Sequence, residues 1–246
     1  MRKRDTQILD ALGVRKKISV QELAELLNVS DVTIRKDLSV LESAGLLKRE
    51  HGFAVLPTSD DVSTRLLFNY ETKRRIARKA AEQVRDGETL MIESGSCCAL
   101  LAEEISTTRR DVTIITNSVF IANFVRHKAA RIILLGGELQ QESQVMVGSL
   151  VKKCAENFSV EKFFMGTDGF NERGAMSGDL MRAEAVRDMA ESARRAIILS
   201  ESKKFSQFGV VPLLAYKQID TVFTDADISA EAKKLFASKG VTVVEA

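Results

Sequence analysis

Two helix-start signals stand close together near the beginning of the chain. Ser19 is a good N-cap residue, and Glu22 three positions later completes a capping box. Ser30 provides a second N-cap directly after Asn28 and Val29, which end the first helical pattern. Hydrophobic staples accompany both caps, in the pairs Ile18 with Leu23 and Val29 with Ile34. Two short helices joined by so tight a turn form a helix-turn-helix hairpin.

An apolar stripe fixes which way the second of these helices faces. Ile34, Leu38 and Leu41 fall within one narrow stripe at about 100° per residue, so we expect them to be buried. The side chains left pointing outward or to the flank are Val32, Thr33, Arg35, Lys36 and Ser39. In a major groove, cations meet phosphates or guanine edges, hydroxyls meet either, and an apolar group meets a thymine methyl. This face therefore suits DNA.

Segments on either side of the hairpin complete a small domain. Apolar residues at helical spacing predict a helix over residues 4–14, and Gly45 is well placed to end the third helix. Residues 46–56 indicate two short strands around Glu50-His51-Gly52, which is a wing. In an isolated helix, Arg35 would more simply pair with Asp31 and Lys36 would be solvated. Three helices and a basic wing favour DNA binding instead.

The pattern of this domain extends well beyond its caps. Its positions are Ile8, Leu9, Val20, Glu22, Leu23, Ala24, Leu27, Val29, Ser30, Thr33, Ile34, Arg35, Lys36, Asp37, Leu38, Leu41, Glu42, Gly45, Arg49, His51, Gly52 and Ala54. Residues 4–54 thereby resemble the winged helix-turn-helix of the DeoR family of bacterial transcriptional regulators, although Phe53 stands where the family usually has a second glycine. Together the outward face and the resemblance predict DNA contacts from Ser30, Val32, Thr33, Arg35, Lys36, Ser39, Lys48, Arg49 and His51.

Charge placement bears on this interpretation only weakly. The chain has 36 Lys or Arg and 34 Asp or Glu, which gives a net charge of +2. Residues 1–56 hold ten of the cations and eight of the carboxylates, so the small excess lies in the expected DNA-binding domain. Mixed charge runs of this kind are most often a solvated surface.

A polar stretch separates this domain from a larger one. Residues 57–64 begin with one of the two prolines and show no apolar period, so we expect a DNA-binding domain over 1–56, a linker over 57–72 and a second domain over 73–246. In that second domain, short apolar runs alternate with helical patterns, which is typical of a mostly parallel sheet covered on both faces. The runs are 90–92, 112–115, 132–135, 163–165, 196–199 and 221–223.

Small and polar residues follow each of these runs. In open α/β sheets, ligands bind beyond the carboxyl ends of the strands, so these residues converge on one candidate site. The stretch Ser94 to Cys98 leads into a helical pattern and would offer backbone N–H groups, hydroxyls and a positive helix end to an anion. A Gly-Ser turn is also an ordinary tight connection, and Asp168, Lys203 and Lys204 also fit simple turn or surface positions.

Further motifs run along the second domain: Lys73-x-x-Ile76-Ala77, Glu93 to Cys97, Thr116-Asn117-Ser118, Gly136-Gly137, Gly148, Phe164 to Gly169, Glu184, Lys204-Phe205 and Thr224-Asp225. Residues 70–246 thereby resemble the sensor domain of the same regulators, which is similar in fold to ribose-5-phosphate isomerase. The family usually has aspartate at Glu93 and Glu201, and threonine at Cys97. The resemblance implies a Rossmann-like domain that binds a phosphorylated sugar or polyol through Glu93, Ser94, Gly95, Ser96, Cys97, Thr116, Asn117, Gly136, Gly137, Asp168, Glu184 and Lys204.

Three functions are weighed on these observations. The first is a repressor of a sugar or polyol utilisation operon, relieved by a phosphorylated sugar and acting as a dimer or tetramer, because one winged module offers few DNA contacts. The second is a sugar-phosphate isomerase or deaminase with a fused winged module, in which Glu93, Asp168 or Glu172 would act as a base. Against it, the related isomerases carry a Lys-Gly-Gly-Gly loop that this chain lacks. The third, a winged module that docks protein, is disfavoured by the outward cations.

Other classes are excluded on composition. The three cysteines are an odd number, two of them are adjacent, and no CxxC spacing exists, which argues against a disulfide framework and a cysteine zinc site and for a reducing cytoplasm. The apolar runs are too short to span a bilayer, and the charged first residues lack the apolar stretch of a signal peptide. We expect no catalytic residues, no metal and no cofactor.

Overall fold

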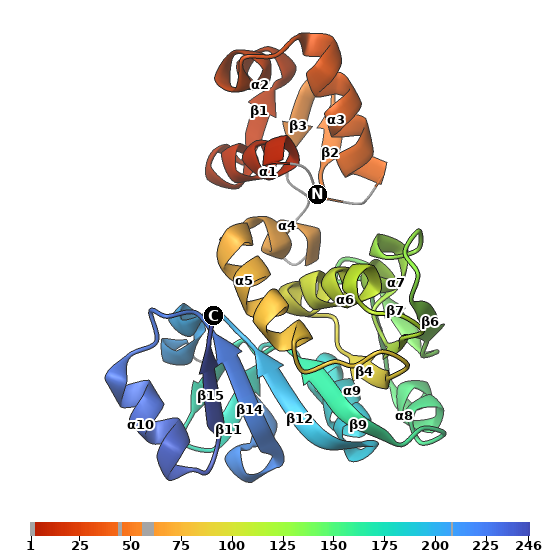
Figure 1. Ribbon diagram of the computed structural model, residues 1–246, viewed down its shortest axis with the longest axis vertical. Helices are drawn as coiled ribbons and strands as arrows, with labels where there is room; N and C mark the ends of the chain where they lie inside the picture. The colour runs from red at the N-terminus through yellow and green to blue at the C-terminus, as the bar shows by residue number, and fades with distance from the viewer. Residues whose placement is uncertain (1–2, 44–45, 56–61, 208) are drawn as a thin grey trace. The chain divides into compact units, whose positions relative to one another are not determined.

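Figure 1 shows the computed structural model of the chain, which describes residues 3–43, 46–55, 62–207 and 209–246. The chain divides into two compact units, Met1–Glu71 and Thr72–Ala246, each with buried apolar residues of its own. The expected helix end at Gly45, residue 56 of the expected DNA-binding domain and residues 57–61 of the expected linker lie outside the described residues.

The first unit is built on the predicted helical hairpin. Its helices are α1 (Lys3–Arg15), α2 (Val20–Leu27) and α3 (Asp31–Ser43). The capping box of α2 is confirmed, because Ser19 Oγ accepts from the Glu22 N–H at 3.1 Å and the Glu22 carboxylate accepts from the Ser19 N–H at 2.9 Å. Ser30 Oγ accepts from the Thr33 N–H at 3.3 Å, which confirms the second cap. The two caps set the tight turn between α2 and α3.

A small antiparallel sheet forms the wing. Its strands are β1 (Lys17–Ser19), β2 (Lys48–Glu50) and β3 (Phe53–Val55), in the order β1-β3-β2. His51 and Gly52, with φ of 45° and 87°, join β2 to β3, as a type I′ turn requires. The turn is therefore complete without a glycine at Phe53, which pairs with Glu50 and with Ser19. The strand β1 was not predicted, since three residues are too few to show alternation.

The expected linker contains regular structure. Helix α4 (Val62–Leu67) lies within it, and α5 (Tyr70–Ala81) begins before its end. Val62, Leu66 and Leu67 of α4 are buried, and α4 packs against α1 within the first unit. The short apolar pair Leu66-Leu67 gives too little periodicity to predict a helix. By its contacts the chain divides after Glu71.

A parallel sheet forms the centre of the second unit. Its strands are β4 (Thr89–Ile92), β5 (Thr113–Thr116), β6 (Arg131–Leu134), β9 (Val160–Met165), β12 (Ala193–Leu199), β14 (Ile219–Thr224) and β15 (Thr242–Glu245). They pair in parallel in the order β15-β14-β12-β9-β4-β5-β6. Each predicted apolar run lies in or overlaps one of them, and β15 was missed. The predicted α/β class with a parallel sheet is confirmed.

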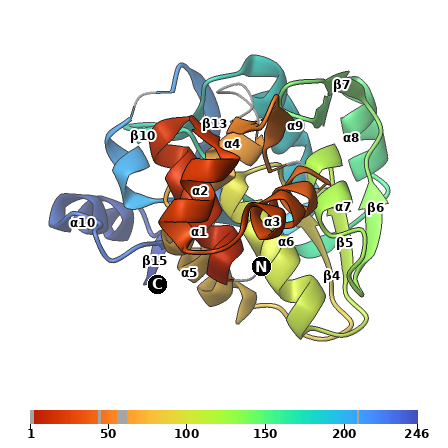
Figure 2. The same ribbon diagram turned by 90° about the horizontal axis from the view of Figure 1, so that it is seen from above.

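Helices cover this sheet on both sides, as Figure 2 shows for α6 on one side and α9 on the other. The helices are α6 (Ser96–Thr108), α7 (Val119–Phe124), α8 (Ser149–Ala155), α9 (Leu180–Glu191) and α10 (Ala230–Ser238), with 3₁₀ turns η1 (Ser202–Ser206) and η2 (Tyr216–Gln218). Two small antiparallel sheets pair β7 (Glu138–Gln140) with β8 (Val145–Val147), and β11 (Gly174–Ser177) with both β10 (Gly169–Asn171) and β13 (Val211–Ala215).

Strand order fixes where the sheet can bind a ligand. From β4 the chain moves outward to β5 and β6, then returns to β9 on the other side of β4 and continues to β12, β14 and β15. The direction of winding therefore reverses between β4 and β9. In open parallel sheets the ligand crevice lies beyond the carboxyl ends of the strands at this reversal.

Candidate DNA-binding surface and effector site

The buried stripe of α3 orients its opposite face toward solvent. Ile34, Leu38 and Leu41 are at most 2% exposed, as predicted. On the opposite face Val32 is 64% exposed, and Lys36 is also exposed. Within the described part of the chain, neither Arg35 nor Lys36 forms an ion pair, so the predicted Arg35–Asp31 alternative is not formed. The cations Arg35 and Lys36 and, in the first turn, the apolar Val32 are thus presented to solvent by α3.

The hydroxyl groups of α3 are engaged inside the domain. Ser39 Oγ donates to the Arg35 carbonyl at 2.8 Å and accepts from Arg49 Nη1 at 2.8 Å. Thr33 Oγ1 lies 2.9 Å from Ser30 Oγ, within hydrogen-bond distance. These hydroxyls were predicted to face DNA, and their hydrogen bonds limit what they offer to it.

Arg49 ties the wing to α3. Its Nε donates to Glu42 Oε2 at 2.7 Å, and its backbone N–H donates to Glu42 Oε1 at 2.9 Å. Arg35, Arg49 and His51 line a cleft between α3 and the wing. Lys48 is exposed on β2. The wing therefore presents its cations beside those of α3.

A buried carboxylate that the sequence analysis did not single out also holds α3. Asp37 is 2% exposed and accepts a hydrogen bond from Arg4 Nε of α1. Its position three residues after Ile34 places it on the buried stripe, so the same periodicity that identified the core could have identified this charge. Asp37 helps to fix the orientation of the whole helix.

In the second unit, Glu93 occupies the point where the winding reverses. Its Oε2 accepts from the Gly166 N–H beyond β9 at 2.9 Å, and its Oε1 accepts from Ser94 Oγ at 3.0 Å. The loops after β4 and β9 approach closely, since a Cβ on Gly95 would lie 3.4 Å from Gly166 Cα. Glu93 and Gly95 therefore join the two loops that border the crevice.

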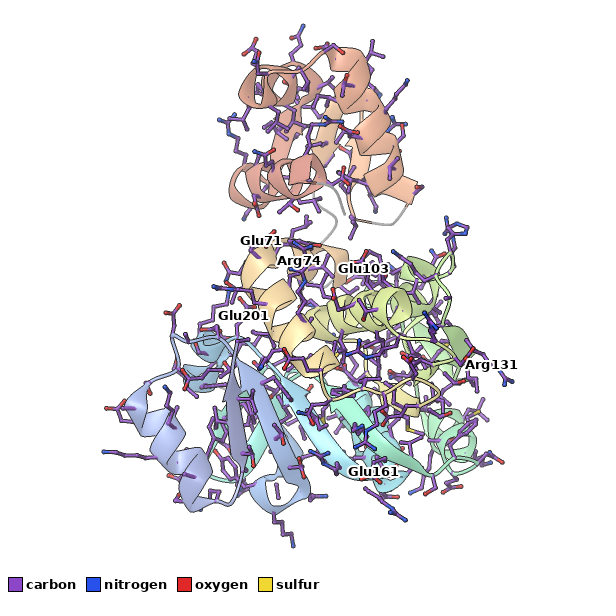
Figure 3. The ribbon with its side chains drawn as sticks, in the orientation of Figure 1. Glu71, Arg74, Glu103, Arg131, Glu161 and Glu201 are labelled. Atoms are coloured by element: carbon purple, nitrogen blue, oxygen red, sulfur yellow. The ribbon has the colours of Figure 1, made fainter. Side chains whose placement is uncertain are left out.

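A buried ion pair lies on the same edge of the sheet. Lys73 of α5 and Glu201 beyond β12 are each 3% exposed, and Lys73 Nζ lies 3.5 Å from Glu201 Oε2. Figure 3 shows the Glu201 side chain beside α5. Burial lowers the pKa of the Lys73 ammonium, and the Glu201 carboxylate opposes that shift. Lys73 and Glu201 both lie in the motifs of the family resemblance, but neither was among the predicted effector-binding residues.

Two further lysines and a thiol surround this pair. Lys203 Nζ lies 3.1 Å from Glu201 Oε1, and Lys204 Nζ donates to the Thr167 carbonyl at 2.9 Å, 3.9 Å from Asp168 Oδ1. Cys97, in the first turn of α6, is close enough to interact electrostatically with Lys73 and Lys204. Burial raises the pKa of its thiol to about 11. The predicted residues Cys97, Asp168 and Lys204 are thus brought together, with Lys73, Glu201 and Lys203 added.

Two sets of contacts hold the loop that carries Lys203 and Lys204. Asp225, beyond β14, accepts from the Ser202 N–H at 2.7 Å and from Ser202 Oγ at 2.6 Å. Phe205 packs edge-on against Phe170 and Phe236, with ring centroids 5.2 Å from each. The lysines after β12 are therefore presented on a loop with two anchors.

Other predicted effector residues lie elsewhere along the edge. Thr116 ends β5 and Asn117 follows it, and both are buried. Asn117 Nδ2 donates to the Met146 carbonyl, and its Oδ1 has no partner among the described residues. At Gly137, a Cβ would lie 2.6 Å from the Val147 carbonyl, so its lack of a side chain serves packing against β8. Gly136 is adjacent, and Glu184 is exposed on α9.

Two other kinds of feature are absent from the described residues. Among them, no three His, Cys, Asp or Glu side chains form a group that would hold a metal ion. No helix in the described ranges has the length and apolar character needed to cross a membrane.

Comparison with known proteins adds family matches along the chain. Residues 4–60 match the family model for the DeoR-like helix-turn-helix domain, and residues 68–226 match that for the DeoR C terminal sensor domain. The chain is 31% identical over 246 residues to the HTH-type transcriptional regulator GolR of Listeria innocua, covering 98% of this chain and 96% of that protein. It is 31% identical to the glycerol-3-phosphate regulon repressor of Escherichia coli, covering 91% and 90%.

Among solved structures the similarity is more distant. Ribose 5-phosphate isomerase A from Methanocaldococcus jannaschii matches with a TM-score of 0.42 and 17% identity, over 56% of this chain and 55% of that one. The eIF2B beta subunit from Chaetomium thermophilum matches with a TM-score of 0.47 and 15% identity, over 72% and 56%.

Proposed function

Because the chain belongs to the DeoR family of transcriptional regulators, we propose that it represses an operon for the use of a sugar or polyol and that a phosphorylated sugar relieves this repression. Both family models and the relatives matched over nearly the full length are regulators, so the chain is a DNA-binding transcriptional regulator and not an enzyme. One E. coli relative is named as a glycerol-3-phosphate regulon repressor, which supports the phosphorylated effector.

The outward face of α3 carries the DNA-binding half of the proposal. Lys36 is exposed, without an ion-pair partner among the described residues, and it stands opposite the buried stripe. Base contacts are assigned to Val32 and Lys36, because the hydroxyls of Thr33 and Ser39 are already hydrogen-bonded within the domain. Phosphate or backbone contacts are assigned to Ser30, Arg35, Lys48, Arg49 and His51. Since Arg49 also holds Glu42 and Ser39, its main contribution is to keep the wing beside α3.

The cluster around Glu201 carries the effector half. Lys73, Lys203 and Lys204 lie around Glu201 and the first turn of α6, where backbone N–H groups favour an anion. Glu201 already supplies a carboxylate to Lys73 and Lys203. A phosphate entering here must therefore displace that carboxylate or share its lysines. We assign the effector to this cluster, with Glu93, Ser94 to Cys97, Asn117 and Asp168 on the remaining sides.

Three broader assignments accompany this function. The DNA-binding domain covers residues 1–56 and the sensor domain residues 73–246, with the intervening segment joining them. The active form is a homodimer or homotetramer, because a single winged module makes few contacts and regulators of this architecture bind repeated half-sites. The site of action is the cytoplasm, where the operator DNA and phosphorylated sugars are found.

Two measurements on the full chain test the proposal. In the first, DNA binding is titrated against salt, and a linear fall of log affinity with log salt is expected for a protein that neutralises phosphates. In the second, thermal unfolding is followed with a panel of phosphorylated sugars and polyols, and a ligand that prefers the native state raises the melting temperature. The effector must then also change the affinity for DNA, because it acts only by binding one state better than the other. A chain that binds DNA but no member of the panel contradicts the sensor half.

A further inference from the structure

The outward face of α3 offers fewer polar groups to DNA than its sequence suggests. A serine hydroxyl has one proton, and that of Ser39 is donated to the Arg35 carbonyl at 2.8 Å. One of its lone pairs also accepts from Arg49 Nη1. The hydroxyl of Thr33 is within hydrogen-bond distance of Ser30 Oγ. Direct reading of bases therefore shifts from the hydroxyls toward the other side chains of this face.

Val32 is the apolar member of that face. It is 64% exposed in the first turn of α3, and Lys36 follows one turn later on the same face. A single exposed valine is ordinary on a protein surface. Its place is what distinguishes Val32, because the N-terminal residues of a recognition helix are the ones that reach base edges in the major groove.

The chemistry of the major groove restricts what Val32 can contact favourably there. Thymine presents a C5 methyl group in the groove, whereas guanine and adenine present acceptors, and cytosine and adenine present amino donors. An apolar side chain placed over those polar groups removes them from water without giving them a hydrogen bond, which costs free energy. Against the thymine methyl, the same side chain buries apolar surface on both partners.

We propose that Val32 is a specificity-determining residue that reads the C5 methyl group of one thymine in each half-site. The inference rests on the proposed function, since it requires α3 to enter the major groove. It goes further by assigning one base to one side chain.

Replacing thymine by deoxyuridine tests this contact directly. The full chain is first used to select a duplex from a random pool, and each thymine of that duplex is then replaced in turn by deoxyuridine, which keeps the base pair and removes only the methyl. We expect one position per half-site where this replacement weakens binding by about fourfold. That is the change in affinity expected from losing the burial of one carbon group. Val32→Ala should bind the unsubstituted duplex about fourfold or more weakly and should no longer respond at that position.

Val40→Ala is the matched control. Val40 is 55% exposed in the last turn of the same helix, so this variant loses the same atoms from a comparable surface. It should respond to deoxyuridine as the unmodified protein does. Both changes replace an exposed valine by a better helix former, so folding is preserved, and a thermal melt verifies this.

The possible failures are distinguishable. If no sequence is enriched over the random pool, the proposed function is wrong and this inference falls with it. If a duplex is selected but no thymine methyl matters, or Val32→Ala responds to its loss as fully as the unmodified chain, only the inference about Val32 is wrong.

Discussion

The outward face of α3 and the loops of the sensor sheet both gather polar side chains, but in opposite surroundings. Lys36 is exposed, with no ion-pair partner in the described ranges, whereas Lys73 and Glu201 are each 3% exposed and lie within 3.5 Å of each other. DNA entering against α3 would have little to displace at Lys36. An anion entering the cluster around Glu201 would compete with contacts that the protein already makes.

Because of this contrast, substitutions in the two regions should affect stability and ligand binding differently. Val32 and Lys36 of the first surface are exposed, so their removal should change DNA binding and leave the fold intact. Residues of the second are part of a core, so their removal should change both. Five substitutions test the contrast, in order of decreasing expected effect.

Removing the carboxylate of Glu201 should have the largest effect. Glu201→Gln removes the carboxylate that lies 3.5 Å from the buried Lys73 ammonium, and breaking a buried pair in this way costs about 3 kcal/mol of unfolding free energy at neutral pH. Glu184→Gln, an exposed carboxylate on α9, should cost less than about 0.5 kcal/mol. Urea unfolding at pH 7 measures both.

The same variant should depend on pH with a defined sign. Burial already lowers the pKa of Lys73, and Glu201 opposes that shift, so its removal lowers the pKa further. A base whose pKa is lower in the folded state binds more protons when unfolded, so stability rises with pH between the folded and unfolded values. The deficit of Glu201→Gln relative to the unmodified chain should therefore shrink from pH 7 to about pH 10, near the unfolded pKa of lysine. A constant deficit would contradict this account of the pair.

A glycine pair provides the next largest effect. In Gly137→Ala the new Cβ would stand 2.6 Å from the Val147 carbonyl, a backbone atom that cannot easily move, so about 1–3 kcal/mol of stability should be lost. In Gly136→Ala the nearest atom is Cys154 Sγ at 3.7 Å, an ordinary contact, and stability should hardly change. Equal losses for the two variants would mean that the tight approach to β8 is not what requires Gly137.

Substitutions of two lysines should weaken the binding of the protein to DNA in different ways. Lys48→Ala should weaken binding to all sequences by about 1 kcal/mol and reduce the salt slope by about one unit, since it removes a phosphate contact. Lys36→Ala should weaken binding and also relax base preference. Neither should change the melting temperature, because both side chains are exposed. Equal loss on specific and random duplexes for both variants would show that Lys36 does not read bases.

Ser39→Ala should have the smallest effect. Its hydroxyl is occupied by Arg35 and Arg49, so DNA affinity should change by less than about 0.5 kcal/mol. A loss as large as that of Lys36→Ala in a binding titration would place the hydroxyl on a base after all.

The sequence was most informative where structure is local. The caps at Ser19 and Ser30 and the stripe of Ile34, Leu38 and Leu41 depend on neighbours within a few residues, so the winged domain and its outward face follow from the pattern. The parallel sheet followed likewise from its apolar runs. Short elements such as β1, and a helix such as α4 inside a polar stretch, carry too few periodic residues to predict.

Contacts across long sequence distances were harder to predict. The pair of Lys73 with Glu201 and the bond from Gly166 to Glu93 arise only when separate strands and helices come together, and no spacing rule connects them. Strand order was also needed to see that the loops after β4 and β9 face each other at the reversal. The motifs pointed to this edge of the sheet and to Asp168 and Lys204, but not to the pairing of Lys73 with Glu201.

Burial of the adjacent thiols of Cys97 and Cys98 lowers their reactivity toward oxidants and alkylating reagents. With a pKa of about 11, Cys97 is present as the reactive thiolate in roughly one molecule in ten thousand at pH 7, and Cys98 is shifted in the same direction. Cys154 on α8 is more accessible than either. A maleimide dye would therefore label the native chain at Cys154 before either thiol of α6.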